Sequence, residues 1–197
     1  MSLAKLRTAA ATILLAFTLA MPAAAAPDRA SLAAIRIDNF GRINDNYFRG
    51  AQPEGRDYAD LRALGVRTII DLTDDGDLRE GGIVQDLGMK FFRIPMSTHE
   101  TPSSSKVARF LELVDNPANQ PVYVHCQGGR HRTGVMTAVY RIADEGWTAN
   151  RAAAEMKQYK FGPDLLHMEF ARFVQMYRPE PPMKAVLPAT AAARRES

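Results

Sequence analysis

The stretch HCQGGRHRTG, residues 125–134, decides the fold of this chain. It follows the β-branched, apolar run PVYVH at 121–125, which predicts a buried strand. It precedes apolar residues at helical spacing over 135–142, which predict a helix from about Thr133. Glycines between a strand and a helix let backbone N–H groups converge, and the helix adds unpaired donors and the positive end of its dipole. The sequence therefore predicts a phosphate-binding loop at 126–132.

Three side chains of this loop predict covalent phosphoryl transfer. Cys126 lies near a helix N-terminus and beside cationic residues, where a thiolate is stabilised and acts as a nucleophile. Arg132 follows six positions later, so a tight turn brings its planar guanidinium back over the site to bind two phosphoryl oxygens at once. Thr133 can donate its hydroxyl proton to the sulfur when a phosphoenzyme breaks down. These three are the predicted catalytic residues of the loop.

The remaining loop residues are expected to bind the substrate. His125 is expected to orient the loop or to tune the thiolate. Arg130 and His131 either contact a polyanionic substrate or lie solvated on the loop, and the sequence leaves both alternatives open. The predicted substrate-binding residues are His125, Gln127, Gly128, Gly129, Arg130 and His131.

Outward from the loop, strand and helix patterns alternate along the chain. Strands are predicted at 47–49, 66–72, 90–94 and 121–125, with Pro95 ending the third. Helices are predicted at 56–64, from the 74–77 turn to 87, around 107–114, from 133, and at 149–159 and 163–177. This alternation predicts a single α/β domain over residues 37–178, with a central, mostly parallel sheet flanked by helices. Its sites are expected at the strand C-terminal ends.

The two ends of the chain have different compositions. Residues 1–26 place Lys5 and Arg7 before the apolar run 9–21, followed by small residues suited to cleavage, which predicts a signal peptide. Residues 27–36 are expected to be a linker, and the proline- and alanine-rich residues 179–197 a disordered tail. The protein is thus expected to be exported, either periplasmic or secreted. The alternative is a membrane anchor formed by the uncleaved N-terminal segment.

Charge and cysteine content exclude several classes of function. Without residues 1–26 the chain has 25 − 2 = 23 basic and 22 acidic residues, so its net charge falls from +3 to about +1. This positive charge is too small to indicate a nucleic-acid-binding surface. Cys126 is the only cysteine, so neither an intramolecular disulfide nor a multi-cysteine metal site can form. We expect no metal and no cofactor, a monomer, and as partner a phosphorylated protein or a small phosphorylated molecule.

The loop at 125–134 resembles the signature of the protein-tyrosine and dual-specificity phosphatase superfamily: a cysteine, five residues, an arginine, and then Ser or Thr. Its ending, Arg-His-Arg-Thr-Gly, is similar to that of the atypical dual-specificity phosphatases of plants and fungi. The segments 39–41 and 47–53 are similar to the start of their catalytic domain, and the resemblance covers about 37–177. It implies a phosphocysteine intermediate and no metal. The implied substrates are phosphotyrosine, phosphoserine, phosphothreonine or inositol phosphates.

The general acid departs from the superfamily pattern. An aspartate is usual in a mobile loop after the strand that precedes the signature, yet MSTHET at 96–101 contains none. Glu100 or His99 is therefore expected to protonate the leaving group. Asp71, Asp74 and Asp75 are candidates only if their turn reaches the site.

Two other functions fit part of the pattern. Rhodanese-like sulfurtransferases also place a cysteine on a loop between a strand and a helix, although the Arg-Thr-Gly ending favours phosphate. A module that binds a phosphorylated ligand without turnover is the other alternative, because the usual aspartate is missing.

Overall fold

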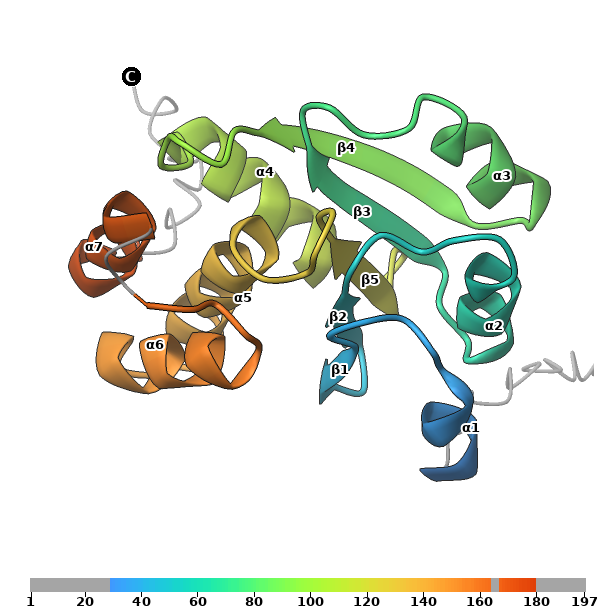
Figure 1. Ribbon diagram of the computed structural model, residues 1–197, viewed down its shortest axis with the longest axis horizontal. Coiled ribbons are helices and arrows are strands. Elements are labelled where there is room, and N and C mark those ends of the chain that lie inside the picture. The colour runs from blue at the N-terminus through green and yellow to red at the C-terminus, as the bar shows by residue number, and fades with distance from the viewer. Residues whose placement is uncertain (1–28, 164–166, 180–197) are drawn as a thin grey trace, which may run out of the picture.

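A computed structural model describes residues 29–163 and 167–179 of the chain (Figure 1). Its centre is a five-stranded sheet with the order β1-β2-β5-β3-β4. The strands are β1 (Gly41–Asn44), β2 (Tyr47–Gly50), β3 (Thr68–Thr73), β4 (Lys90–Met96) and β5 (Val122–His125). Only the β1–β2 pair is antiparallel; β2 and β3 flank β5 in parallel, and β4 runs parallel to β3. The predicted α/β domain with a mostly parallel sheet is confirmed.

Helices cover both faces of this sheet (Figure 1). The helices are α1 (Arg29–Ala34), α2 (Asp57–Ala63), α3 (Glu80–Asp86), α4 (Ser104–Asp115), α5 (Arg132–Ala143), α6 (Ala149–Gln158) and α7 (Met168–Met176). Apolar side chains of α2 and α3 pack on one face, and those of α4 and α5 on the other. Helices α6 and α7 pack against the outer side of α5 around Phe161 and Phe170. No helix among the described residues combines the length and apolarity that crossing a membrane requires.

The alternation of side chains along β5 separates the two residues that begin the predicted loop. Val122 and Val124 lie in the core beneath α4 and α5, and Cys126 joins the same core. Tyr123 lies in the core beneath α2 and α3. Because successive side chains of a strand point to opposite faces, His125 follows Tyr123 to the α2–α3 side. The strand thus delivers Cys126 and His125 to opposite sides of the sheet.

Three local features differ from expectation. The antiparallel strand β1 was not predicted. Pro95 lies inside β4 rather than ending it, because β4 is an edge strand where a missing N–H is tolerated, and the register with β3 shifts there. Helix α1 lies within the expected linker, where the partly buried Leu32 and Ile35 pack against the core beneath α2. Residues 1–28, 164–166 and 180–197, which include the predicted signal peptide and nearly all of the tail, lie outside the described residues.

Candidate active site

The predicted phosphate loop connects β5, which ends at His125, to α5, which begins at Arg132. Gly129 has φ = 61°, and a Cβ there would lie 2.3 Å from the carbonyl carbon of Gly50, so only glycine fits this turn. Among the described residues, the backbone N–H groups of residues 127–131 donate to no hydrogen-bond partner. The loop therefore offers a run of free donors at the N-terminus of a helix, as an anion site requires.

Residues from the start of the domain hold this loop in place. The Gly129 carbonyl oxygen accepts a hydrogen bond from Asn39 Nδ2 at 2.7 Å and another from Arg49 Nη2. The backbone N–H of Gln52 donates to the Gln127 carbonyl oxygen at 3.1 Å. These contacts explain why the segments 39–41 and 47–53 belong to the same sequence pattern as the loop.

The predicted nucleophile lies at the base of the loop. Cys126 is 2% exposed and forms no disulfide. Thr133 is fully buried on the first turn of α5, and its Oγ1 has no hydrogen-bond partner among the described residues. The hydroxyl is therefore available to a sulfur or a phosphoryl oxygen, as its predicted role requires.

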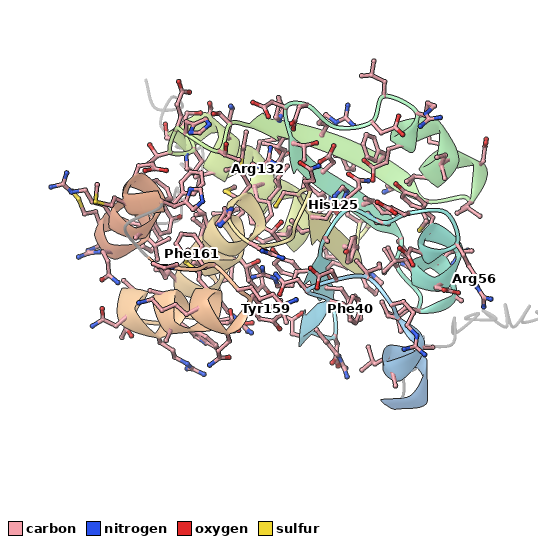
Figure 2. All side chains as sticks on the ribbon, in the orientation of Figure 1. Phe40, Arg56, His125, Arg132, Tyr159 and Phe161 are labelled. Atoms are coloured by element: carbon pink, nitrogen blue, oxygen red, sulfur yellow. The ribbon has the colours of Figure 1, made fainter. Side chains whose placement is uncertain are left out.

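Arg132 connects the loop to two neighbouring strand ends (Figure 2). Its Nη1 lies 3.2 Å from Asp74 Oδ1 and 3.5 Å from Asp75 Oδ1, both in the turn after β3, and donates to the Met96 carbonyl oxygen at 3.0 Å. The Arg132 side chain is 5% exposed, and its Nε is buried without a partner among the described residues. The turn after β3 thus reaches the site, which meets the condition set for Asp74 and Asp75.

His125 does not line the substrate side of the loop, which corrects its predicted place among the substrate-binding residues. Its fully buried ring lies with Nε2 3.0 Å from Glu80 Oε1 and Nδ1 4.0 Å from Asp71 Oδ1. Glu80 also accepts hydrogen bonds from Gln52 at 2.8 Å and Tyr58 at 3.1 Å. His125 therefore supports the loop from the α2–α3 side, because strand alternation turns it away from Cys126.

The cluster of Asp71, Glu80 and His125 also has the residue types of a metal site, with potential ligand atoms within 4.8 Å of one another. A guanidinium already provides a cation there. Arg93 Nε donates to Asp71 Oδ2 at 2.6 Å, and Arg93 Nη2 lies 3.8 Å from Glu80 Oε2. Asp71 also accepts hydrogen bonds from the N–H and hydroxyl of Thr73, so it is a structural residue rather than a general acid.

The two remaining loop side chains have different surroundings. Arg130 is half exposed, with Nη2 3.5 Å from Asp38 Oδ2. His131 is partly buried: its Nε2 lies 3.1 Å from the Phe161 carbonyl oxygen, and its ring packs against His167 at 3.7 Å between centroids. Burial, followed by the charge of His167, lowers the pKa of His131. His131 thus ties the loop to the segment between α6 and α7.

The predicted general acids lie in the loop after β4. His99 and Glu100 are exposed, and neither side chain has a hydrogen bond or ion pair among the described residues. The same loop begins at Met96, whose carbonyl oxygen contacts Arg132. It therefore starts at the site, while its two titratable side chains extend into solvent.

A polar cavity of about 600 Å³ opens beside the phosphate loop. It lies between the turns that follow β2 and β3, and its lining includes Gln52, Tyr58, Asp75, Asp77, Arg79 and Gln127. Gln127 forms the boundary between this cavity and the loop.

Comparison with known families shows which protein family has this arrangement. Residues 38–172 match the family model described as a DSP-PTPase phosphatase fused to NAD+ kinase. The chain belongs to the DSP-PTPase phosphatase family. The matched region contains all five strands, the phosphate loop and its supports.

Three curated relatives show the range of this family. The chain is 32% identical over 108 residues to a probable tyrosine-protein phosphatase, DG1060, of Dictyostelium discoideum, covering 52% of this chain and 65% of the relative. It is 29% identical over 168 residues to the dual specificity protein phosphatase TpbA of Pseudomonas aeruginosa, covering 82% and 76%. It is 27% identical over 146 residues to the inositol diphosphatase SIW14 of Saccharomyces cerevisiae, covering 71% and 51%. The chain therefore spans less than two thirds of the Dictyostelium and yeast relatives.

Solved structures of two of these DSP-PTPase relatives have the same fold. The core catalytic domain of SIW14 in complex with citrate superposes with a TM-score of 0.64 at 26% identity, covering 72% of this chain and 87% of that one. The TpbA crystal structure superposes with a TM-score of 0.62 at 25% identity, covering 72% and 86%.

Sequence reasoning missed the residues that support the DSP-PTPase loop from other parts of the chain. Asn39 and Arg49 were seen only as part of a family resemblance, and Glu80 and Arg93 were not singled out. Asn39 carries one local signal, because it adopts φ = 58°, a conformation that asparagine tolerates better than most residues. The others have no signal in the linear sequence, since their partners lie 22 to 80 positions away.

Proposed function

We propose that this DSP-PTPase hydrolyses phosphate monoesters, of phosphotyrosine or dual-specificity type, through a phosphocysteine intermediate on Cys126. The observation that carries this proposal is the run of unpartnered N–H groups over 127–131 between Cys126 and the guanidinium of Arg132. Free donors and a fixed cation around a cysteine are suited to a phosphoryl group and to the charge that develops on it during transfer.

The proposed reaction has two steps. In the first, the Cys126 thiolate attacks phosphorus, an S–P bond forms, the P–O bond to the leaving group breaks, and that oxygen takes a proton from a general acid. In the second, water gives a proton back to the deprotonated general acid and attacks phosphorus, the S–P bond breaks, inorganic phosphate leaves, and the thiolate returns with the help of the Thr133 hydroxyl. Glu100 is the proposed proton donor and His99 the alternative. Asp74 and Asp75 are weaker candidates because Arg132 already engages their carboxylates.

Turnover and intermediate trapping test this mechanism. The mature chain should hydrolyse p-nitrophenyl phosphate, and rapid acid quenching should trap a mass increase of one phosphoryl group on the peptide that contains Cys126. Turnover without such an adduct would contradict the covalent route. No turnover together with tight phosphate binding would favour the binding-module alternative. Because the chain belongs to a phosphatase family, we no longer favour the sulfurtransferase alternative.

Small inositol phosphates are a second substrate class, favoured by the SIW14 relationship. The rim of the loop carries two cations, Arg130 and Lys160, but both pair with Asp38, the latter at 2.6 Å. This shared carboxylate reduces the net positive charge that a polyanionic ring would meet. We therefore favour singly phosphorylated substrates. Side-by-side rates on phosphopeptides, nucleotides and inositol phosphates test this, and a preference for the inositol phosphates would reverse it.

We further propose that catalysis needs no metal ion. The loop supplies donors and positive charge itself, and Arg93 provides the cation of the Asp71–Glu80–His125 cluster. EDTA should leave the rate on an aryl phosphate unchanged within twofold. Loss of activity with recovery on adding a divalent cation would refute this.

Export is proposed from residues 1–26 alone. Expression of the full chain followed by cell fractionation, with mass spectrometry of the N-terminus, should find a cleaved chain outside the inner membrane. A full-length chain in the membrane fraction would support the anchored alternative.

A further inference from the structure

An apolar groove of about 660 Å³ lies between α4 and α7, where α5 ends. Its walls include Val107, Ala108 and Leu111 of α4 and Phe173 and Met176 of α7. Several of these side chains remain accessible: Leu111 and Phe173 are only partly buried, and Met176 is 68% exposed. A continuous apolar surface of this kind on a folded chain marks a place where another apolar group packs.

The chain itself runs along this groove as it leaves α7. Helix α7 ends at Met176, and Tyr177, Arg178 and Pro179 all line the groove. Tyr177 has an extended backbone, with φ = −60° and ψ = 130°. Prolines stand at 179, 181 and 182, and the residue before a proline favours an extended conformation. The sequence therefore favours an extended path that starts at the groove wall.

The residues that follow have the composition to fill an apolar groove. The segment 181–188, PPMKAVLP, contains Met183, Val186 and Leu187 between prolines. In a polyproline conformation, with about three residues per turn, Met183 and Val186 fall on the same side, with Leu187 beside them. The nine steps from Pro179 to Pro188 then span about 28 Å, whereas the 12-residue α4 is about 18 Å long. The segment is thus long enough to follow α4 along the groove.

We propose that residues 181–188 pack in this groove in an extended conformation, with Met183, Val186 and Leu187 against α4 and α7. The segment covers apolar surface that the described residues leave accessible. It restricts the disordered tail that the composition predicts to the residues after Pro188. A second copy of this chain is the alternative occupant of the groove.

The groove is remote from the proposed active site. Arg132 begins α5 and Ala143, which lines the groove, ends it, so about 17 Å of helix separate the two. The inference therefore does not rest on the proposed phosphatase activity, and its experiment needs no substrate.

Limited trypsin digestion of the full chain tests the packing, because Lys184 lies inside the segment and Arg194 outside it. A packed segment must detach before trypsin can bind around Lys184, so cleavage there should be about tenfold slower than at Arg194, or slower still. Val186→Ser combined with Leu187→Ser removes the apolar contacts and should bring the two rates close together. Mass spectrometry of timed samples measures both rates in one reaction. Equal rates in the parent chain would overturn the proposal.

Two control variants separate packing from sequence effects on the protease. Ala191→Ser combined with Ala192→Ser makes a similar change outside the segment and should leave the Lys184 rate unchanged. Ala108→Asp puts a charge into the groove without altering the tail, and should accelerate cleavage at Lys184 about as much as the double serine variant. Its control is Ala118→Asp, at an exposed position in the turn after α4, which should have no effect. An unchanged Lys184 rate in Ala108→Asp would overturn the proposal.

Sedimentation of the parent chain and of Ala108→Asp distinguishes the second-copy alternative. With the tail in the groove, both chains should sediment as monomers. A parent dimer that dissociates in Ala108→Asp would assign the groove to a second copy and overturn the proposal.

Discussion

At the scale of single residues, the site separates the proposed nucleophile from the arginine proposed to bind phosphate. Cys126 is held in the apolar core beneath α4 and α5. Arg132 reaches across from the first turn of α5 to the turns after β3 and β4. Because the two residues have different tasks, substitutions should affect attack and binding differently.

Cys126→Ser should abolish turnover while phosphate or vanadate still binds, because the hydroxyl is a poor nucleophile but the donors of the loop remain. Arg132→Lys should lose about as much activity, since a point charge cannot replace the bidentate fork. Steady-state rates on p-nitrophenyl phosphate and calorimetric titration with vanadate measure the two effects. Appreciable turnover by the serine variant would rule out the covalent route.

The proton donor can be identified by its dependence on the leaving group. Glu100→Gln should slow hydrolysis of an alkyl phosphate by about 10²-fold or more, and of p-nitrophenyl phosphate far less, because a poor leaving group needs its proton in the transition state. The matched control is Asp74→Asn, which changes a carboxylate paired with Arg132 and should affect both substrates by the same factor. If Asp74→Asn shows the leaving-group dependence instead, the acid lies in the turn after β3.

At the scale of elements, the loop between β5 and α5 depends on one of its two glycines. Gly129 sits against the Gly50 backbone with a positive φ, whereas a Cβ on Gly128 would meet only the Arg130 side chain, at 3.6 Å. The motif alone makes the two positions look equivalent. Packing against β2 distinguishes them.

Gly129→Ala should therefore destabilise the domain by at least about 1–2 kcal/mol, the cost of a left-handed conformation for a residue with a Cβ. It should also abolish phosphate binding, because the loop must move away from Gly50. Gly128→Ala should cost only a few tenths of a kcal/mol. Thermal melts and phosphate titrations of both variants check this, and equal effects would show that the loop is not held against β2.

At the scale of the whole molecule, the ends of α4 and α5 bring two carboxylates together on the side of the sheet that carries Cys126. Asp115 closes α4, and Asp144 is the C-cap of α5. Partial burial, followed by the charge of Asp115, raises the pKa of Asp144 to about 7. The folded state therefore holds this proton more tightly than the unfolded chain, and stability should fall as pH rises from about 4 towards 7.

Asp144→Asn removes this pH-dependent loss. The Tm of the variant relative to the parent chain should rise between pH 5 and pH 8. Glu112→Gln is the control, since it breaks the exposed 2.7 Å ion pair with Arg109 on α4 and should leave the pH response of Tm unchanged. A parallel response of both variants to pH would contradict the Asp115–Asp144 interaction.

The sequence alone predicted the strand, loop and helix of the phosphate site and suggested a chemistry for them. Strand 121–125, the loop and the helix after it are local patterns, so their residue types and spacing predict them, and with them Cys126, Arg132 and the α/β class. Prediction from local sequence failed where the neighbouring strands of the sheet determine the structure. Pro95 continues β4 because that strand has no partner on one side, and β1 forms because β2 offers it an edge.

Only the tertiary structure decided which distant residues meet this loop. Strand alternation places His125 on the opposite side from Cys126, and the sheet order β2-β5-β3 brings Arg49 and Asp74 to it from strands far apart in the sequence. The linear sequence does not indicate these long-range contacts, because they depend on strand register and on the crossovers between parallel strands. For that reason a candidate nucleophile could be named from ten residues, whereas the charged residues that surround it could not.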